Sequence, residues 1–154
     1  MKPPTPARRT DAPIHRMTVY FEQDDTPPTR RLFTPDQANR TLPLVRRIIA
    51  DLREEHTAAK RLHDELCNVP LMDRGRRRQI GRRITRKVRR LERLVEEVRC
   101  IGADVADYRT ATVEFAALID DRPAVLSWRP GESRVQHWRD PSVTEDQRKP
   151  LTTG

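Results

Sequence analysis

Apolar residues in the middle of the chain recur at the spacing of an α-helix. Each of two successive runs places an apolar stripe along one side of a helix. We therefore predict helices over residues 35–67 and 76–104. The first run consists of Leu42, Val45, Ile49, Leu52, Ala59, Leu62 and Leu66, and the second of Ile80, Ile84, Val88, Leu91, Leu94, Val98, Ile101 and Val105.

The start of the first predicted helix carries a capping signal. Thr34 is followed by a proline and, three residues on, by Gln37, which together are typical of a capping box. Pro43 removes one backbone donor and is expected to kink the first turns. Residues 68–75 contain Pro70 and Gly75 and form the predicted linker. Two long helices joined by a short linker are expected to pack as an antiparallel hairpin.

After Gly102 the apolar period changes from that of a helix to two. Residues 113–119, 124–128 and 133–138 are short β-prone runs, which predict a three-stranded antiparallel meander over residues 112–139. So small a sheet needs a surface to pack on. The apolar stripes at the open end of the hairpin are wider than one partner helix requires, so we expect the sheet, or a second copy of the chain, to cover them. The predicted fold class is α+β, mostly helical.

The two ends of the chain differ from this regular centre. Residues 1–31 are rich in proline and poor in apolar residues, which predicts a mostly disordered tail, with a short edge strand over residues 17–21 as a possible exception. Residues 141–154 are predicted to be a polar tail, which leaves one domain over residues 32–140. No apolar run resembles a secretory signal or is long enough to span a bilayer, so we expect a soluble cytoplasmic protein without a membrane partner.

Positive charge is concentrated on the second predicted helix. Residues 74–93 contain eleven Arg or Lys side chains against one acid, Glu92, whereas residues 51–66 carry five acids against three bases. The resulting charges of +10 and −2 account for the whole net charge of +8. Arginine suits phosphate, so RNA or a ribosomal surface is the expected partner. The predicted polyanion-binding residues are Arg76, Arg77, Arg78, Arg82, Arg83, Arg86, Lys87, Arg89, Arg90 and Arg93.

Two other interpretations of this pattern stay open. The basic helix can be a solvated surface whose arginines pair with acids of the first helix, although five acids cannot neutralise eleven bases. Alternatively, the wide apolar stripe can make the chain a homodimer or an adaptor.

Other reactive side chains give no clear chemistry. Cys67 and Cys100 would lie roughly 30 Å apart at 1.5 Å per helical residue and cannot form a bridge. His56 and His63 lie seven residues apart near the arginines, where positive charge disfavours a cation, so we interpret them as polar packing residues. No nucleotide-binding loop or hydrolase motif is present. We predict no catalytic residue, no metal site and no cofactor.

Motifs around the first helix cap and in the meander resemble the bacterial family of uncharacterised proteins known as domain of unknown function 2203. They are residues 31–39, Leu42-Pro43, Val113-Glu114-Phe115, Leu126-Ser127-Trp128, Gly131-Glu132 and Trp138. The resemblance implies a helical hairpin followed by a small sheet and singles out Glu114, Phe115, Trp128, Gly131, Glu132 and Trp138 as shared motif residues.

The same family pattern has Asp at the position of Glu114, Cys at that of Ser127 and His at that of Arg139. Such a set would imply a metal or catalytic site, but this chain departs from it at three positions. A third hypothesis is therefore a small-molecule or metal site built from Glu114, Glu132 and His137.

Overall fold

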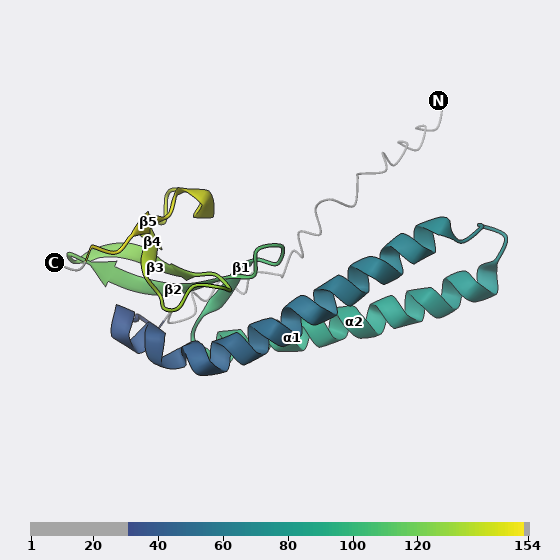
Figure 1. Ribbon diagram of the computed structural model, residues 1–154, viewed down its shortest axis with the longest axis horizontal. Helices are drawn as coiled ribbons and strands as arrows, with labels where there is room; N and C mark the ends of the chain where they lie inside the picture. Colours follow the sequence, from purple (N-terminus) through teal and green to yellow (C-terminus); the bar gives the residue numbers. More distant parts are fainter. Residues whose placement is uncertain (1–30, 153–154) are drawn as a thin grey trace, which may run out of the picture.

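The computed structural model describes residues 31–152; all but the last residue of the predicted N-terminal tail, including its possible strand over residues 17–21, lies outside this range. Helices α1 (Pro35–Asn68) and α2 (Arg74–Ile101) pack against each other as a long antiparallel hairpin, and a small antiparallel sheet follows at the open end of the hairpin (Figure 1). The predicted fold class is confirmed.

The start of α1 is fixed by the predicted capping box. The Thr34 hydroxyl accepts a hydrogen bond from the Gln37 N–H at 3.2 Å, and the Gln37 side chain accepts one from the Thr34 N–H at 3.0 Å. Two of the N–H groups that a helix start leaves unpaired are thereby satisfied. Pro43 lies inside α1, and Figure 1 shows the first turns of the helix at an angle to the longer remainder.

Helix α2 begins and ends earlier than predicted. Asp73 caps its start by accepting a hydrogen bond from the Arg76 N–H at 3.1 Å. It stops at Ile101 because Gly102 adopts a left-handed conformation, with φ of 101°, and donates its N–H to the Arg99 carbonyl at 2.9 Å. Asp104, predicted as the last helical residue, therefore belongs to the first strand, and that part of the helix prediction is wrong.

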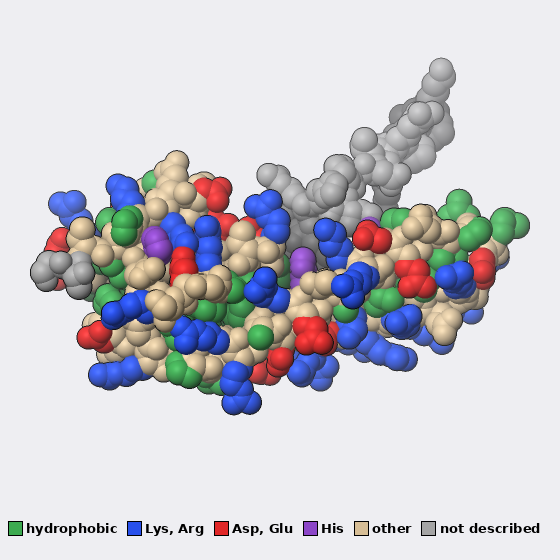
Figure 2. Space-filling view, viewed as in Figure 1, with side chains coloured by type: hydrophobic (Ala, Val, Ile, Leu, Met, Phe, Trp, Pro, Cys, Tyr) green, Lys and Arg blue, Asp and Glu red, His purple; other side chains and the backbone are tan. Residues whose placement is uncertain are grey.

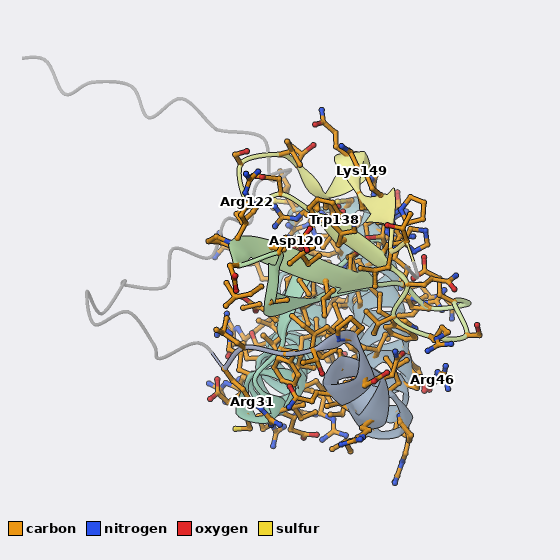
Figure 3. All side chains as sticks on the ribbon, turned by 90° about the vertical axis from the view of Figure 1, so that its left-hand side faces the viewer. Arg31, Arg46, Asp120, Arg122, Trp138 and Lys149 are labelled. Atoms are coloured by element: carbon orange, nitrogen blue, oxygen red, sulfur yellow. The ribbon has the colours of Figure 1, made fainter. Side chains whose placement is uncertain are left out.

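The sheet has five strands in chain order, each antiparallel to the next. They are β1 (Asp104–Asp107), β2 (Thr112–Ile119), β3 (Arg122–Trp128), β4 (His137–Arg139) and β5 (Lys149–Pro150). The predicted meander corresponds to β2, β3 and β4. Figure 3 looks from the sheet end, with Asp120 and Arg122 at the turn between β2 and β3 and Lys149 on the last strand.

The last predicted strand is shorter than expected because its first residues bond to α1. The Val135 N–H donates to the Asn39 side chain at 2.6 Å, and the Ser133 carbonyl accepts a hydrogen bond from Arg46 at 2.5 Å. These backbone groups are therefore unavailable to β3. Pairing resumes at His137, opposite Ser127.

Residues after 140, predicted as a polar tail, form structure. They contain the short 3-10 helix η1 (Glu145–Gln147) and β5, and the Leu151 N–H donates to the Gln136 carbonyl at 2.7 Å. In Figure 1, η1 and the chain leading to β5 lie across the sheet from the helices. This end of the chain thus belongs to the fold as far as Leu151.

The main core lies between the hairpin and one face of the sheet. Trp128 and Phe115 are its largest buried side chains, and the Phe33 ring meets Phe115 edge-on at a centroid distance of 5.1 Å. The sheet covers the apolar stripes at the open end of the hairpin. This was the first of the two predicted arrangements, the other being a second copy of the chain. A second, smaller cluster of Leu62, Val69 and Ile80 holds the far end of the hairpin together.

Candidate nucleic-acid interface

The basic residues of α2 divide between two sides of the helix. The buried side chains of Ile80, Leu94, Val95 and Val98 mark the side that packs on α1 and the sheet. Because an α-helix has about 3.6 residues per turn, the spacing of five exposed arginines places them on the opposite side of α2. We call them the outer row: Arg78, Arg82, Arg86, Arg89 and Arg93.

The outer row is nearly straight. Its members are spaced by four, four, three and four residues, so successive side chains emerge about 4.5–6 Å apart along the helix axis. The whole row extends over about 22 Å. Figure 2 shows Lys and Arg side chains distributed along the hairpin, with fewer acidic side chains among them.

Ion pairs across the hairpin involve few of these bases. Within residues 31–152, the basic residues between 74 and 93 form two: Arg76 with Glu65 at 3.5 Å, and Lys87 with Glu55 at 3.0 Å. No ion pair involves a member of the outer row in this part of the chain. The geometry is therefore not that of a salt-bridge lattice between the helices.

Arg77, one of the predicted polyanion-binding residues, has a different environment. Its guanidinium donates to the carbonyl oxygens of Leu66 at 3.2 Å and Val69 at 2.9 Å. The last carbonyls of a helix lack intrahelical partners, and a cation there also offsets the negative end of the helix dipole. Arg77 thus closes the tip of the hairpin instead of extending the outer row.

A second charged region lies on the face of the sheet away from the helices. Residues alternate between the two faces of a strand, so Glu114, Ser127 and Arg139 share this face while their neighbours Phe115 and Trp138 point to the core. Arg139 holds Glu114 through two hydrogen bonds, at 2.6 and 3.1 Å. These bonds raise the pKa of Arg139 above its usual value.

Glu132 is the centre of a second ion pair on this face. Its carboxylate accepts hydrogen bonds from both terminal nitrogens of Arg148 and, at 2.9 Å, from the Arg129 N–H. Burial alone raises the pKa of Glu132, but the hydrogen bonds from Arg148 and Arg129 outweigh it and hold that pKa below its usual value. His137 Nδ1 lies 3.5 Å from the same carboxylate.

The 3-10 helix η1 brings a further carboxyl group to this face. Burial raises the pKa of Glu145. A hydrogen bond to Asp107 and the negative charge of Asp107 raise this pKa further. Burial also raises the pKa of Asp107, but the hydrogen bond from Glu145 and those from the Arg109 and Thr110 N–H groups bring it below its usual value. The two carboxyl groups thus have pKa values shifted in opposite directions.

Glu114, Glu132 and His137, the predicted small-molecule or metal site, share this face of the sheet, but the charges of the two glutamates are balanced by arginines. Glu114 and Glu132 are each paired with an arginine, and no group of three or more metal-ligating side chains suited to a metal ion occurs between residues 31 and 152. His56 stacks on Tyr108 at a centroid distance of 6.3 Å, and His63 Nε2 lies 3.9 Å from Cys67 Sγ.

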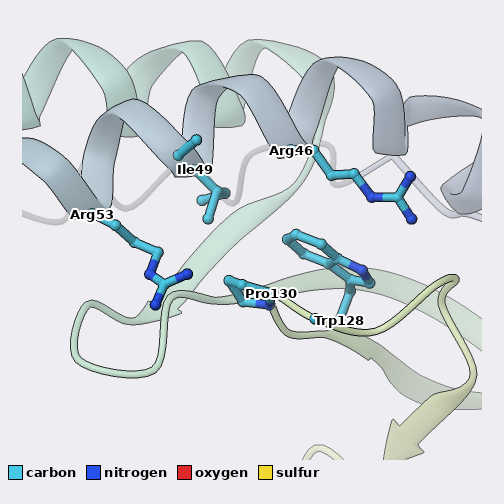
Figure 4. Close-up of a pocket in the computed structure, with 7 residues that line it drawn as sticks. Arg46, Ile49, Arg53, Trp128 and Pro130 are labelled. Atoms are coloured by element: carbon cyan, nitrogen blue, oxygen red, sulfur yellow. The ribbon is translucent and has the colours of Figure 1, made fainter.

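A shallow hollow of about 150 Å³ lies between α1 and the turn after β3. Figure 4 shows Trp128 and Pro130 at its base, with Arg46 and Arg53 of α1 on either side. Arg46 donates a hydrogen bond to the Ser133 carbonyl, and this bond joins the loop after β3 to α1 at the edge of the hollow.

A family model described as "Uncharacterized conserved protein (DUF2203)" matches residues 31–151. The chain belongs to this family. No curated protein and no solved structure matches it. The DUF2203 match begins just before the cap of α1 and ends just after β5, so it spans both the hairpin and the whole sheet.

The predicted family-motif residues lie at the sheet end of the molecule. Phe115 and Trp128 are core side chains, and the Trp128 indole N–H donates to the Glu132 carbonyl at 3.0 Å, closing the turn that contains Gly131. Trp138 packs on the edge of the same core. Their contacts give these residues a structural role.

Sequence reasoning missed Arg148, Glu145 and Asp107, which complete the polar face of the sheet. Arg148 lies 16 residues from Glu132, beyond any helical or strand period. The one available signal was the clustering of charged residues after residue 140, where a tail was predicted.

Neither α1 nor α2 nor any other helix between residues 31 and 152 has the length and apolar character that would span a membrane.

Proposed function

We propose that this protein binds RNA, without reading its sequence, through the outer row of α2. The observation that carries the proposal is that five exposed arginines form one straight row and enter no ion pair with the rest of residues 31–152. Unpaired cations at this density attract a polyanion and release its counterions on binding.

The shape of the row favours a strand of phosphates. Arginines about 4.5–6 Å apart on a rigid helix present a linear track, and the guanidinium fork pairs with phosphate oxygens through two parallel hydrogen bonds. Helix α2 has no aromatic side chain on which bases could stack, so contacts with the backbone dominate.

The apolar side of α2 disfavours an anionic membrane as the partner. A helix that lies on a membrane buries its apolar side in the lipid. That side of α2 is already covered by α1 and by the sheet.

The test measures RNA affinity at several salt concentrations by fluorescence anisotropy. If the five arginines contact five phosphates of a single strand, the slope of log K against log salt is about −3.5. Replacing all five with Gln should remove most of this slope. Removing like charges at i and i+4 does not weaken α2, so the variant should stay folded by circular dichroism.

The matched control removes the same charge elsewhere. Arg40, Arg47, Arg109, Arg122 and Arg134 are exposed and lie outside the distal hairpin. Their replacement with Gln should leave most of the RNA affinity and of the salt slope. Equal losses in the two variants, or binding to anionic vesicles in place of RNA, would contradict the proposal.

A further inference from the structure

A second side of α2 carries four cations around an open hollow. Arg83, Arg86, Lys87 and Arg90 line a hollow of about 310 Å³ together with Glu55 of α1. The four basic residues are spaced as i, i+3, i+4 and i+7, which places them on one side of the helix. We call this the lateral hollow. It shares only Arg86 with the outer row.

The charges in the lateral hollow do not cancel. The Glu55 carboxylate lies 3.0 Å from Lys87 Nζ, so one acid neutralises one of four bases and also fixes the position of the lysine. Three guanidinium groups remain, with a net charge of +3 for the five lining residues. Arg83 and Arg86 are exposed, while Arg90 is half-buried against the hairpin.

Resting on the function proposed above, we propose that the lateral hollow binds the terminal 5′-phosphate of an RNA strand. A phosphodiester inside a strand carries one negative charge, whereas a terminal phosphate carries about two at neutral pH and has three free oxygens. Three guanidinium groups around one hollow match the second kind of ligand in both charge and number of acceptors.

The position of the hollow fits the end of a strand bound on the outer row. Arg86, the third of the five residues in the outer row, belongs to both sites, so a terminal phosphate in the hollow and the next phosphates on one half of the row can contact neighbouring side chains. The outer row then supplies affinity that is independent of the strand end, and the hollow supplies preference for a phosphorylated end.

The test compares two oligoribonucleotides of one sequence, labelled at the 3′ end, which carry either a 5′-phosphate or a 5′-hydroxyl. The full chain should bind the phosphorylated strand roughly tenfold more tightly. The preference should shrink below about pH 6, where the terminal phosphate takes up a proton. Equal affinity for the two strands overturns this inference and leaves the proposed function standing, whereas binding of neither overturns the proposed function.

Adjacent residues provide a matched pair of variants. Arg83 and Arg90 face the hollow, while Arg82 and Arg89 belong to the outer row, one residue earlier in each case. The variant R83Q/R90Q should lose the 5′-phosphate preference. The variant R82Q/R89Q, with the same change in charge, should weaken both strands alike and keep the preference. The opposite assignment overturns the inference.

A competition experiment separates a strand end from a free phosphorylated compound. A nucleoside 5′-monophosphate offers the same terminal phosphate but cannot contact the outer row. It should displace the phosphorylated strand only at concentrations far above the strand's own dissociation constant. Displacement at concentrations close to that constant would identify the free compound as the ligand and overturn the proposal.

Discussion

The two ends of the molecule hold their arginines in opposite ways. At the sheet end, Arg139 and Arg148 each form two hydrogen bonds with one carboxylate and are largely shielded from water. Along the hairpin, the outer row is exposed and forms no ion pair within residues 31–152. Arginine side chains thus stabilise the fold at the sheet end, whereas those of the outer row leave their charge available to a ligand.

Breaking the ion pair at Glu132 should have the largest effect on stability. The variant Glu132→Gln leaves the shielded Arg148 guanidinium without a counter-charge, and we expect a loss of about 2–3 kcal/mol in the free energy of unfolding. Urea denaturation at neutral pH measures it. An unchanged midpoint would contradict the structural role of this pair.

The same pair predicts how stability depends on pH. The pKa of Glu132 is lower in the folded chain than its usual value of 4.5, so its contribution is present above that value. The contribution is lost as the pH falls through the folded pKa. The difference between the wild-type protein and Glu132→Gln should therefore shrink as urea midpoints are measured from about pH 7 to about pH 3.

The junction between the two ends depends on Gly102. Replacement with Ala forces a side chain into a left-handed conformation and places a Cβ 3.2 Å from the Phe33 ring, so we expect a loss of about 1–2 kcal/mol. Gly81 lies inside α2 with open space around it, and Gly81→Ala should instead gain about 0.5–1 kcal/mol. Thermal denaturation of both variants compares them, and equal shifts would contradict this interpretation.

The carboxyl pair of Glu145 and Asp107 should have a smaller effect, of the opposite sign. Because the folded pKa of Glu145 is raised, its contribution is present below the unfolded value and is lost as the pH rises through the folded value. Glu145→Gln keeps a hydrogen-bond donor without that ionisation. It should raise stability at about pH 8 by less than about 1 kcal/mol and have no benefit near pH 4. The exposed neighbour Asp146, changed to Asn, serves as the control.

The smallest effect is expected from the exposed pair of Arg76 and Glu65. The two side chains are 57% and 41% exposed, so Arg76→Gln should cost below about 0.5 kcal/mol, and added salt should remove the difference. A loss as large as that of Glu132→Gln would erase the contrast between the two ends of the molecule.

Much of the fold could be predicted because the hairpin is encoded by local signals. The capping box at Thr34 and the apolar stripes depend on residues three or four positions apart, and the structure confirms both. The end of α2 was missed because the stripe continues through Val105, while the left-handed conformation of Gly102 stops the helix. Strands β1 and β5 were missed because four and two residues carry too little alternation to show.

The candidate interface was only partly predictable from the sequence. The number of arginines between residues 74 and 93 could be counted, but the sequence does not say which of them pair. Arg77 bonds to carbonyl groups of the hairpin tip, and Lys87 pairs with Glu55 on the other helix. These contacts join residues on different elements, so they appear only when the two helices are packed together.

The hairpin is held by two separate apolar clusters, one under the sheet and one at the tip, which share no buried residue. Between Leu52 and Leu62, residues 53–61 of α1 have no buried side chain. The length of the hairpin could therefore change without disturbing either cluster. Removing seven residues, about two turns, from each helix would keep the apolar sides nearly in phase. It would bring the tip closer to the sheet, and it would shorten the basic track without altering the domain that carries it.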